Sequence, residues 1–270
     1  MDINFDRNRA QDFLEKTIDP SYDPSSANTT QINIFKTKVD AFQLNSLQTL
    51  RLKTLVEQDA NDYLFNASVS FCNALQGIDR QNYSWAAVEL YYCMYYLLRA
   101  KVHYNNYVLF RIKGILYLKL ANSEKFISTG GNTSNTHKTT LKIFKILFPT
   151  DYIFTYEVDF KNSVEWMEDV REIVNYRNVR FSEPNQMSFF DKFKDLHSLS
   201  SNINEILKNP TNVFQPEFAM VGLPIVFFQE IQRENSIQMK NIFSVDKIDY
   251  LRNIIDTLNL PQIYNFLSLK

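Results

Sequence analysis

Residues 84–100 read SWAAVELYYCMYYLLRA, and this stretch decides the fold. Apolar side chains surround nearly every angle of a helix drawn through it, as is typical of a helix at the centre of a bundle. Before it, residues 40–78 place their apolar side chains on one helical stripe, and Gly77 and a short polar connection follow. Because the connection is short, we expect these two helices to be antiparallel neighbours, with Ser84 as the N-cap of the second.

The rest of the chain is also helical in pattern, with one exception. Residues 107–128 alternate loosely between apolar and polar side chains and contain Gly114, which predicts a small β-hairpin between helices. The sequence therefore predicts a mainly α fold, an antiparallel helical bundle with a small β-hairpin insertion and a C-terminal helical extension. The further helices are expected at about 137–148, 160–181, 189–207, 217–233, 245–258 and 262–267.

Three parts are predicted along the chain. An N-terminal arm takes residues 1–40, where breakers such as Asp19-Pro20 interrupt a weak pattern. The helical bundle takes residues 41–183. A C-terminal helical extension, residues 184–270, is expected to pack on the bundle.

Composition excludes several classes of protein. The 270 residues are 45% hydrophobic and 22% charged, so the chain can bury a substantial core. The net charge of −1 excludes a polycation, so contact with a nucleic acid requires a local patch. Five glycines form no nucleotide-binding motif, and the two cysteines and three histidines form no metal-binding motif. We therefore expect neither a cofactor nor a metal ion.

The N-terminal residues give no sign of a signal peptide, since they are charged and lack an apolar segment. The most apolar run, Leu90 to Leu98, is too short to span a bilayer. The expected location is the cytoplasm, with no membrane partner.

The most unusual local cluster is residues 171–182, REIVNYRNVRFS. On a continuous α-helix, Arg171, Asn175, Asn178 and Ser182 fall on one line, with Arg177 beside it. A guanidinium group suits a phosphate, and an asparagine amide can orient it or bind a 2′-hydroxyl. The alternative is that nearby carboxylates hold these arginines in surface ion pairs.

Aromatic residues are interpreted as packing. The row of tyrosines in the second helix resembles a base-stacking platform, but on an all-apolar helix core packing is the favoured interpretation. The same interpretation makes both tryptophans packing anchors. These residues are Tyr91, Tyr92, Tyr95 and Tyr96, with Trp85 and Trp166.

Three pieces of the sequence together resemble a known family. They are residues 84–100, the THK segment that leads into LKIFKILF at 136–148, and REIVNYRN at 171–178. In this order they are similar to the HEPN superfamily of prokaryotic helical domains, found in toxin–antitoxin and anti-phage systems. The likeness covers about residues 45–183.

The resemblance implies a bundle that often dimerises through its final helix. In active members, an arginine, a polar neighbour and a histidine form a metal-independent ribonuclease site. Arg177-Asn178 matches the arginine and its neighbour, but Ser182, Glu183 and Pro184 stand where the histidine is expected. Arg171 to Tyr176 matches a variant that ends in tyrosine. Serine is no substitute for an imidazole that transfers a proton near neutral pH.

The candidate residues follow from this comparison. His137 is the one nearby candidate to replace the missing imidazole, because the family fold brings its loop towards the final helix. The catalytic candidates are Arg171, Tyr176, Arg177, Asn178 and His137, and the candidates for binding RNA or a partner are Asn175, Arg180 and Ser182.

Three functions compete. The first is a non-catalytic HEPN-like subunit of a defence or toxin–antitoxin assembly, which binds a protein partner, RNA or both and forms a homodimer. The second is an active metal-independent endoribonuclease with an altered Arg/Tyr site. The third is an unrelated helical adaptor whose polar ladder faces solvent.

Overall fold

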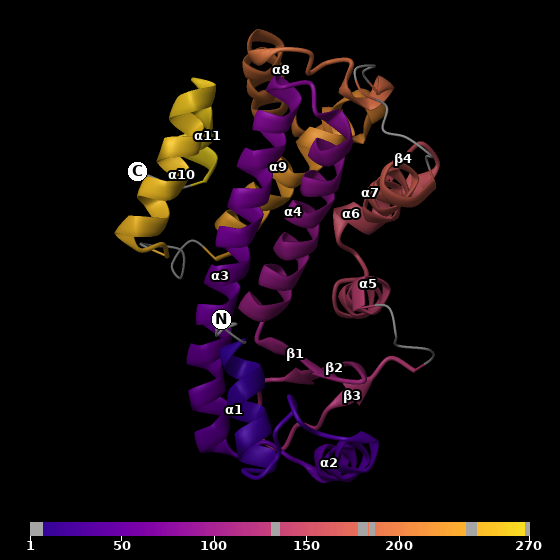
Figure 1. The fold of residues 1–270 in the computed structure, drawn as a ribbon, viewed down its shortest axis with the longest axis vertical. Helices are drawn as coiled ribbons and strands as arrows, with labels where there is room; N and C mark the ends of the chain where they lie inside the picture. Colours follow the sequence, from indigo (N-terminus) through magenta and orange to yellow (C-terminus); the bar gives the residue numbers. More distant parts are fainter. Residues whose placement is uncertain (1–7, 131–135, 178–182, 184–186, 236–241, 268–270) are drawn as a thin grey trace. The chain divides into compact units, whose positions relative to one another are not determined.

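The computed structural model describes residues 8–130, 136–177, 183, 187–235 and 242–267. Contacts divide the chain into two compact units, residues 1–62 with 98–148 and residues 63–97 with 149–270. The fold is mainly α with a small β-hairpin, as predicted (Figure 1). The parts predicted at 1–40, 41–183 and 184–270 stay predictions. Among the described helices, none is both long enough and apolar enough to cross a membrane.

The two longest helices confirm the predicted antiparallel pair. Helix α3 runs over Ser46–Asp79 and α4 over Tyr83–Tyr104. Gly77, in the last turn of α3, lets α4 approach closely, because a Cβ atom there would lie 3.3 Å from the Cβ of Ala86. Further along the pair, the Tyr63 and Tyr96 rings stack with their centroids 6.5 Å apart.

The first unit joins helices to a three-stranded antiparallel sheet in the order β1-β2-β3. Arg111 pairs with Ile115, so the hairpin turns at Lys113. A core of buried aliphatic and aromatic side chains from α1, α2, α3 and the hairpin includes Leu14, Phe35, Val56 and Phe110. The elements that complete this unit are α1 (Arg9–Ile18), α2 (Thr29–Ala41), β1 (Tyr107–Ile112), β2 (Gly114–Lys119), β3 (Ile127–Ser128) and α5 (Thr136–Leu147).

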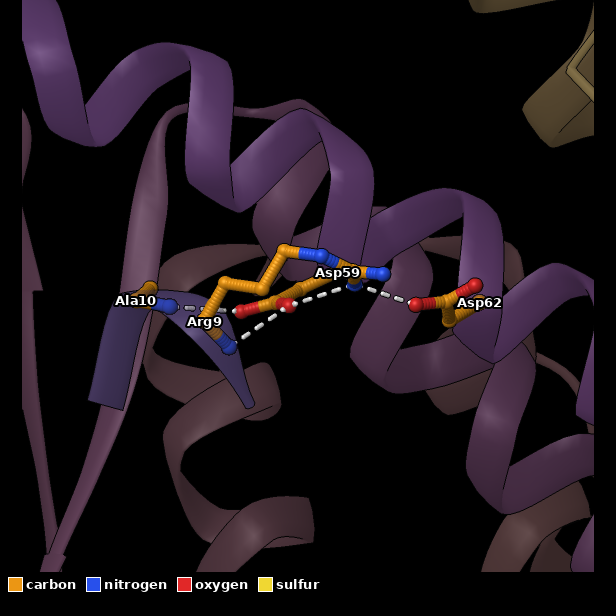
Figure 2. Close-up of polar contacts among 4 residues, drawn as sticks. All are labelled: Arg9, Ala10, Asp59 and Asp62. Carbon is orange, nitrogen blue, oxygen red and sulfur yellow. Dashed lines mark hydrogen bonds and ion pairs between the residues drawn. The ribbon is translucent and has the colours of Figure 1, made fainter. Parts of the chain in front are cut away.

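Helix α1 begins without a cap from its own N-cap residue, Asn8. Asp59 of α3 takes that role: its carboxylate accepts hydrogen bonds from the backbone N–H groups of Arg9 and Ala10, each 3.0 Å long (Figure 2). The Arg9 guanidinium lies between Asp59, 3.4 Å away, and Asp62. A carboxylate at a helix N-terminus satisfies orphan donors and complements the helix dipole. This cap therefore ties α1 to α3.

The second unit is built around the buried helix α9, which packs against several other helices of this unit. Phe266 of α11 packs edge-on against Phe71 of α3, with ring centroids 5.3 Å apart. The elements after residue 148 are α6 (Tyr152–Thr155), β4 (Glu157–Val158), β5 (Lys161–Asn162), α7 (Ser163–Glu172), η1 (Ile173–Arg177), η2 (Ser188–Phe190), α8 (Leu196–Lys208), η3 (Pro210–Phe214), α9 (Pro216–Glu234), α10 (Val245–Leu258) and α11 (Gln262–Phe266).

Two expectations about apolar residues are wrong. The helix predicted from residue 160 begins at Ser163, because Asp159 and Phe160 form the turn of the β4–β5 hairpin with φ of 52° and 62°. Phe160 is therefore 91% exposed instead of packed. Trp85 is 48% exposed and is not a core anchor, whereas Trp166 is buried against Phe189.

Candidate functional site

The candidate site lies at the end of α7, in the second unit. Asn162 caps this helix, since its side-chain oxygen accepts a hydrogen bond of 3.0 Å from the backbone N–H of Glu165. Val164 and Met167 then point into the core, each 1% exposed or less. The last residues of α7 therefore have a fixed orientation, set by the cap at one end and by packing along the helix.

The α-helix does not continue through the motif. From Ile173 to Arg177 the backbone forms a π-helix, so the predicted continuous α-helix is wrong at this end too. Residues five apart lie on different faces of an α-helix, but the i→i+5 hydrogen bond of a π-helix brings them together. The calculated line of Arg171 and Asn175 assumed α-helical spacing and does not apply here. The residue that shares a face with Arg171 is Tyr176.

Arg171 is buried and held between aromatic rings. Its side chain is 8% exposed, and the guanidinium carbon lies 4.8 Å from the ring centroid of Tyr91 and 5.6 Å from that of Tyr176. Both distances are within the range of cation–π attraction. Its Nε atom is buried without a hydrogen-bond partner among the described residues. Arg171 is therefore buried and does not face solvent, and its Nε–H donor is not used by the described residues.

The groups around Arg171 form a small buried electrostatic cluster. Tyr91 of α4 is 1% exposed and Glu168, one turn before Arg171, is 7% exposed. Burial raises the pKa of Tyr91 well above its usual value, the charge of Glu168 raises it further, and Arg171 opposes both. A phenol with a raised pKa keeps its proton near neutral pH, so Tyr91 is no general base.

The chain beyond the motif returns to the start of α4. The Glu183 carboxylate accepts hydrogen bonds from the backbone N–H of Ser84, at 2.6 Å, and from its hydroxyl, at 2.8 Å. Helix α4 begins at Tyr83, so Ser84 is not the N-cap as predicted. An anionic side chain at this helix N-terminus is favourable for the reason given for Asp59.

The structure brings only part of the predicted site together. Arg171 and Tyr176 are in contact, and Asn175 lies half-buried on the π-helix between them. His137 is half-buried in the first turn of α5, which belongs to the other unit. Asn178, Arg180 and Ser182 lie outside the described residues, as does the side chain of Arg177. The functional roles of all these residues stay predictions.

No metal centre is formed by the described part of the chain. None of its His, Cys, Asp and Glu side chains gather in groups of three or more that could hold a metal ion. Cys72 and Cys93 are both buried and free. Burial raises the pKa of Cys72 to about 12, so its thiol stays protonated.

Sequence reasoning missed the partners of Arg171. Tyr91 was assigned to plain core packing, and its buried ring also carries the guanidinium. The contact between Arg171 and Tyr176 depends on the π-helix, and the hydrophobic pattern of the sequence does not distinguish an i+5 contact from an i+4 contact. Two other tyrosines of the row, Tyr92 and Tyr96, line a pocket and are only half-buried.

The site thus consists of helix α7, the π-helix that follows it, and the buried Arg171. Residues 60–180 match the family model described as the HEPN domain. No curated protein and no solved structure matches the chain significantly. This match, which covers less than half of the chain, confirms the resemblance to the HEPN superfamily found in the sequence.

Proposed function

We propose that this protein is a non-catalytic HEPN subunit of a prokaryotic anti-phage defence or toxin–antitoxin assembly, which binds a partner at its π-helical end without cutting RNA. The observation that carries the proposal is the burial of Arg171 between Tyr91 and Tyr176. A catalytic arginine must offer its donors to a phosphate, and burial of this guanidinium against two aromatic rings hinders the approach of a substrate.

The chemistry of the surrounding groups supports the same conclusion. RNA cleavage without a metal ion needs a group that exchanges a proton near neutral pH. Residues 171–183 contain no histidine, and burial raises the pKa of Tyr91 away from neutrality. The π-helix instead presents two exposed side chains suited to contact with a partner: Ile173 is 44% exposed and Tyr176 71%.

A second candidate function is an active metal-independent endoribonuclease. The π-helix favours it, because π-turns are rare and occur frequently at functional sites. In this case Arg177 and Asn178 would act with Arg171 and Tyr176. Under either function we expect a cytoplasmic homodimer that joins a protein partner or RNA.

Expression in a bacterial host separates the two functions. Arg177→Ala is the informative variant, since Arg171→Ala removes a buried group and would also weaken folding. The proposal predicts that wild type and Arg177→Ala leave growth and cellular RNA equally intact. Growth arrest with RNA cleavage by the wild type, relieved by Arg177→Ala, would establish the ribonuclease instead.

The binding half of the proposal has its own test. We expect Tyr176→Ala to weaken self-association or capture of labelled single-stranded RNA, measured by light scattering and fluorescence anisotropy. Trp85→Ala is the matched control, because Trp85 is also an exposed aromatic side chain of this unit. A wild-type chain that stays monomeric and binds no RNA would overturn the binding half of the proposal.

A further inference from the structure

The second unit also contains a pocket whose lining includes none of the residues of the π-helical site. It lies between the second half of α3, the middle of α4, and α10, and its volume is about 640 Å³. This is within the range of small-molecule sites. The pocket is open to solvent on one side, as the half-exposed Tyr250 at its edge indicates.

Four aromatic rings and one carboxylate line this pocket. Tyr92 and Tyr96 come from α4, with ring centroids 6.3 Å apart. Phe65 of α3 and Tyr250 of α10 form a second pair, also 6.3 Å apart. Glu89 precedes Tyr92 and Tyr96 by three and seven residues, so all three side chains share one face of α4. The pocket therefore combines one carboxylate with four aromatic rings.

The carboxylate has no cationic partner in the pocket. Among the described lining residues, Glu89 is the one charged side chain, and the other polar groups are amides and hydroxyls. Burial raises the pKa of Glu89, although a hydrogen bond from the Ser70 hydroxyl opposes the shift. A partly buried carboxylate without a counter-charge is costly, and a cation that enters the pocket would remove this cost.

One of the four rings, that of Phe65, already contacts a cation. The Lys247 ammonium, which does not line the pocket, lies 4.8 Å from the centroid of the Phe65 ring. Aromatic faces attract ammonium and guanidinium groups through their quadrupole, and cages of such faces are a general device for recognising quaternary ammonium groups.

We propose that this pocket binds an organic cation, an ammonium or guanidinium group enclosed by Tyr92, Tyr96, Phe65 and Tyr250 and paired with Glu89. The group could belong to a free polyamine or to a lysine or arginine side chain of a partner protein. A nucleotide fits less well, because Glu89 repels phosphate and no lining side chain in the described part offers a compensating positive charge.

Calorimetry with the full chain and a matched pair of probes tests the charge requirement. Choline carries a quaternary ammonium group, and 3,3-dimethyl-1-butanol is its neutral isostere. We expect saturable binding of choline with a dissociation constant below about 1 mM and no binding of the alcohol. Equal binding of the two probes, binding of neither, or preferred binding of guanosine would overturn the proposal.

Variants then assign the binding to the pocket. Glu89→Gln keeps the shape and removes the charge, so it should weaken choline binding by about tenfold or more. Glu165→Gln removes a carboxylate from an exposed position on α7 and should leave the affinity unchanged. If Glu89→Gln fails to fold, Tyr250→Ala replaces it, since this half-exposed ring can be truncated without opening the core. Equal affinities of Glu89→Gln, or of its replacement, and the control would refute the site.

Two further probes distinguish the sources of the cation. Tight binding of spermidine with weak binding of N-acetyl-arginine amide and N-acetyl-lysine amide indicates a free polyamine. The reverse order indicates a side chain of a partner protein. Both outcomes support the cation site, and neither depends on whether the π-helical end cuts RNA.

Discussion

Replacing Asp59 by alanine is expected to detach the first turn of α1 from α3. The carboxylate is 2% exposed and accepts two backbone hydrogen bonds, from Arg9 and Ala10 (Figure 2). Loss of an N-terminal cap costs about 1 kcal/mol, and a buried N–H left without an acceptor, that of Ala10, costs a further 1–3 kcal/mol or so. We therefore expect the free energy of unfolding of this unit to fall by about 2–4 kcal/mol.

Urea unfolding and hydrogen exchange of the α1 amides measure this loss. Asp62→Ala is the matched control, because it removes the other carboxylate that contacts Arg9. Asp62 and Arg9 are 37% and 46% exposed, and such surface ion pairs contribute only about 0–1 kcal/mol. Equal losses of stability in the two variants would show that Asp59 does not cap α1. The same conclusion would follow if the α1 amides of Asp59→Ala exchanged no faster than those of the wild type.

Three other changes test separate features of the structure. Burial, and next the charge of Arg99, lowers the pKa of His103 from 6.5 to about 3, so the folded state resists protonation. The contribution of His103 to the free energy of unfolding is therefore complete above pH 6.5 and falls as the pH drops towards 3, by about 2 kcal/mol at pH 5. His103→Phe should flatten this slope in thermal melts. Gly222→Ala should cost about 1–3 kcal/mol in urea unfolding, because the new Cβ would lie 2.6 Å from Cγ1 of Val213; an unchanged midpoint would show that the packing yields there. Phe160→Gly should stabilise by about 0.5–1 kcal/mol, since φ of 62° strains a residue with a Cβ and the exposed ring loses little contact; a lower melting temperature would mean that the ring packs.

Hydrophobic periodicity predicted the parts of the fold that depend on burial. The α3–α4 pair and the hairpin of β1 and β2 lie within a few residues of their expected places. Periodicity failed where the backbone departs from standard geometry. At Phe160 a turn with positive φ replaces the expected first turn of a helix, and from Ile173 a π-helix replaces the α-helix. Neither the turn nor the π-helix can be predicted from the order of apolar and polar residues.

The functional roles of the candidate residues stay predictions, and the structure reports only on the contacts of those that it describes. Arg171 and Tyr176 were identified as a pair from the family resemblance, and they touch. That Arg171 is buried on Tyr91 depends on long-range packing, which a local pattern does not contain. Tyr92 and Tyr96 were expected in the core, and the structure instead places them half-buried in the lining of a pocket that also contains Glu89.

The most direct test of the central claim is cleavage of labelled single-stranded RNA by the purified chain at neutral pH, with a chelator present to remove divalent metal ions. We expect the wild-type chain and Arg177→Ala to leave the RNA equally intact, because the Arg171 guanidinium is buried against the rings of Tyr91 and Tyr176. Cleavage by the wild type that is lost in Arg177→Ala would contradict this expectation.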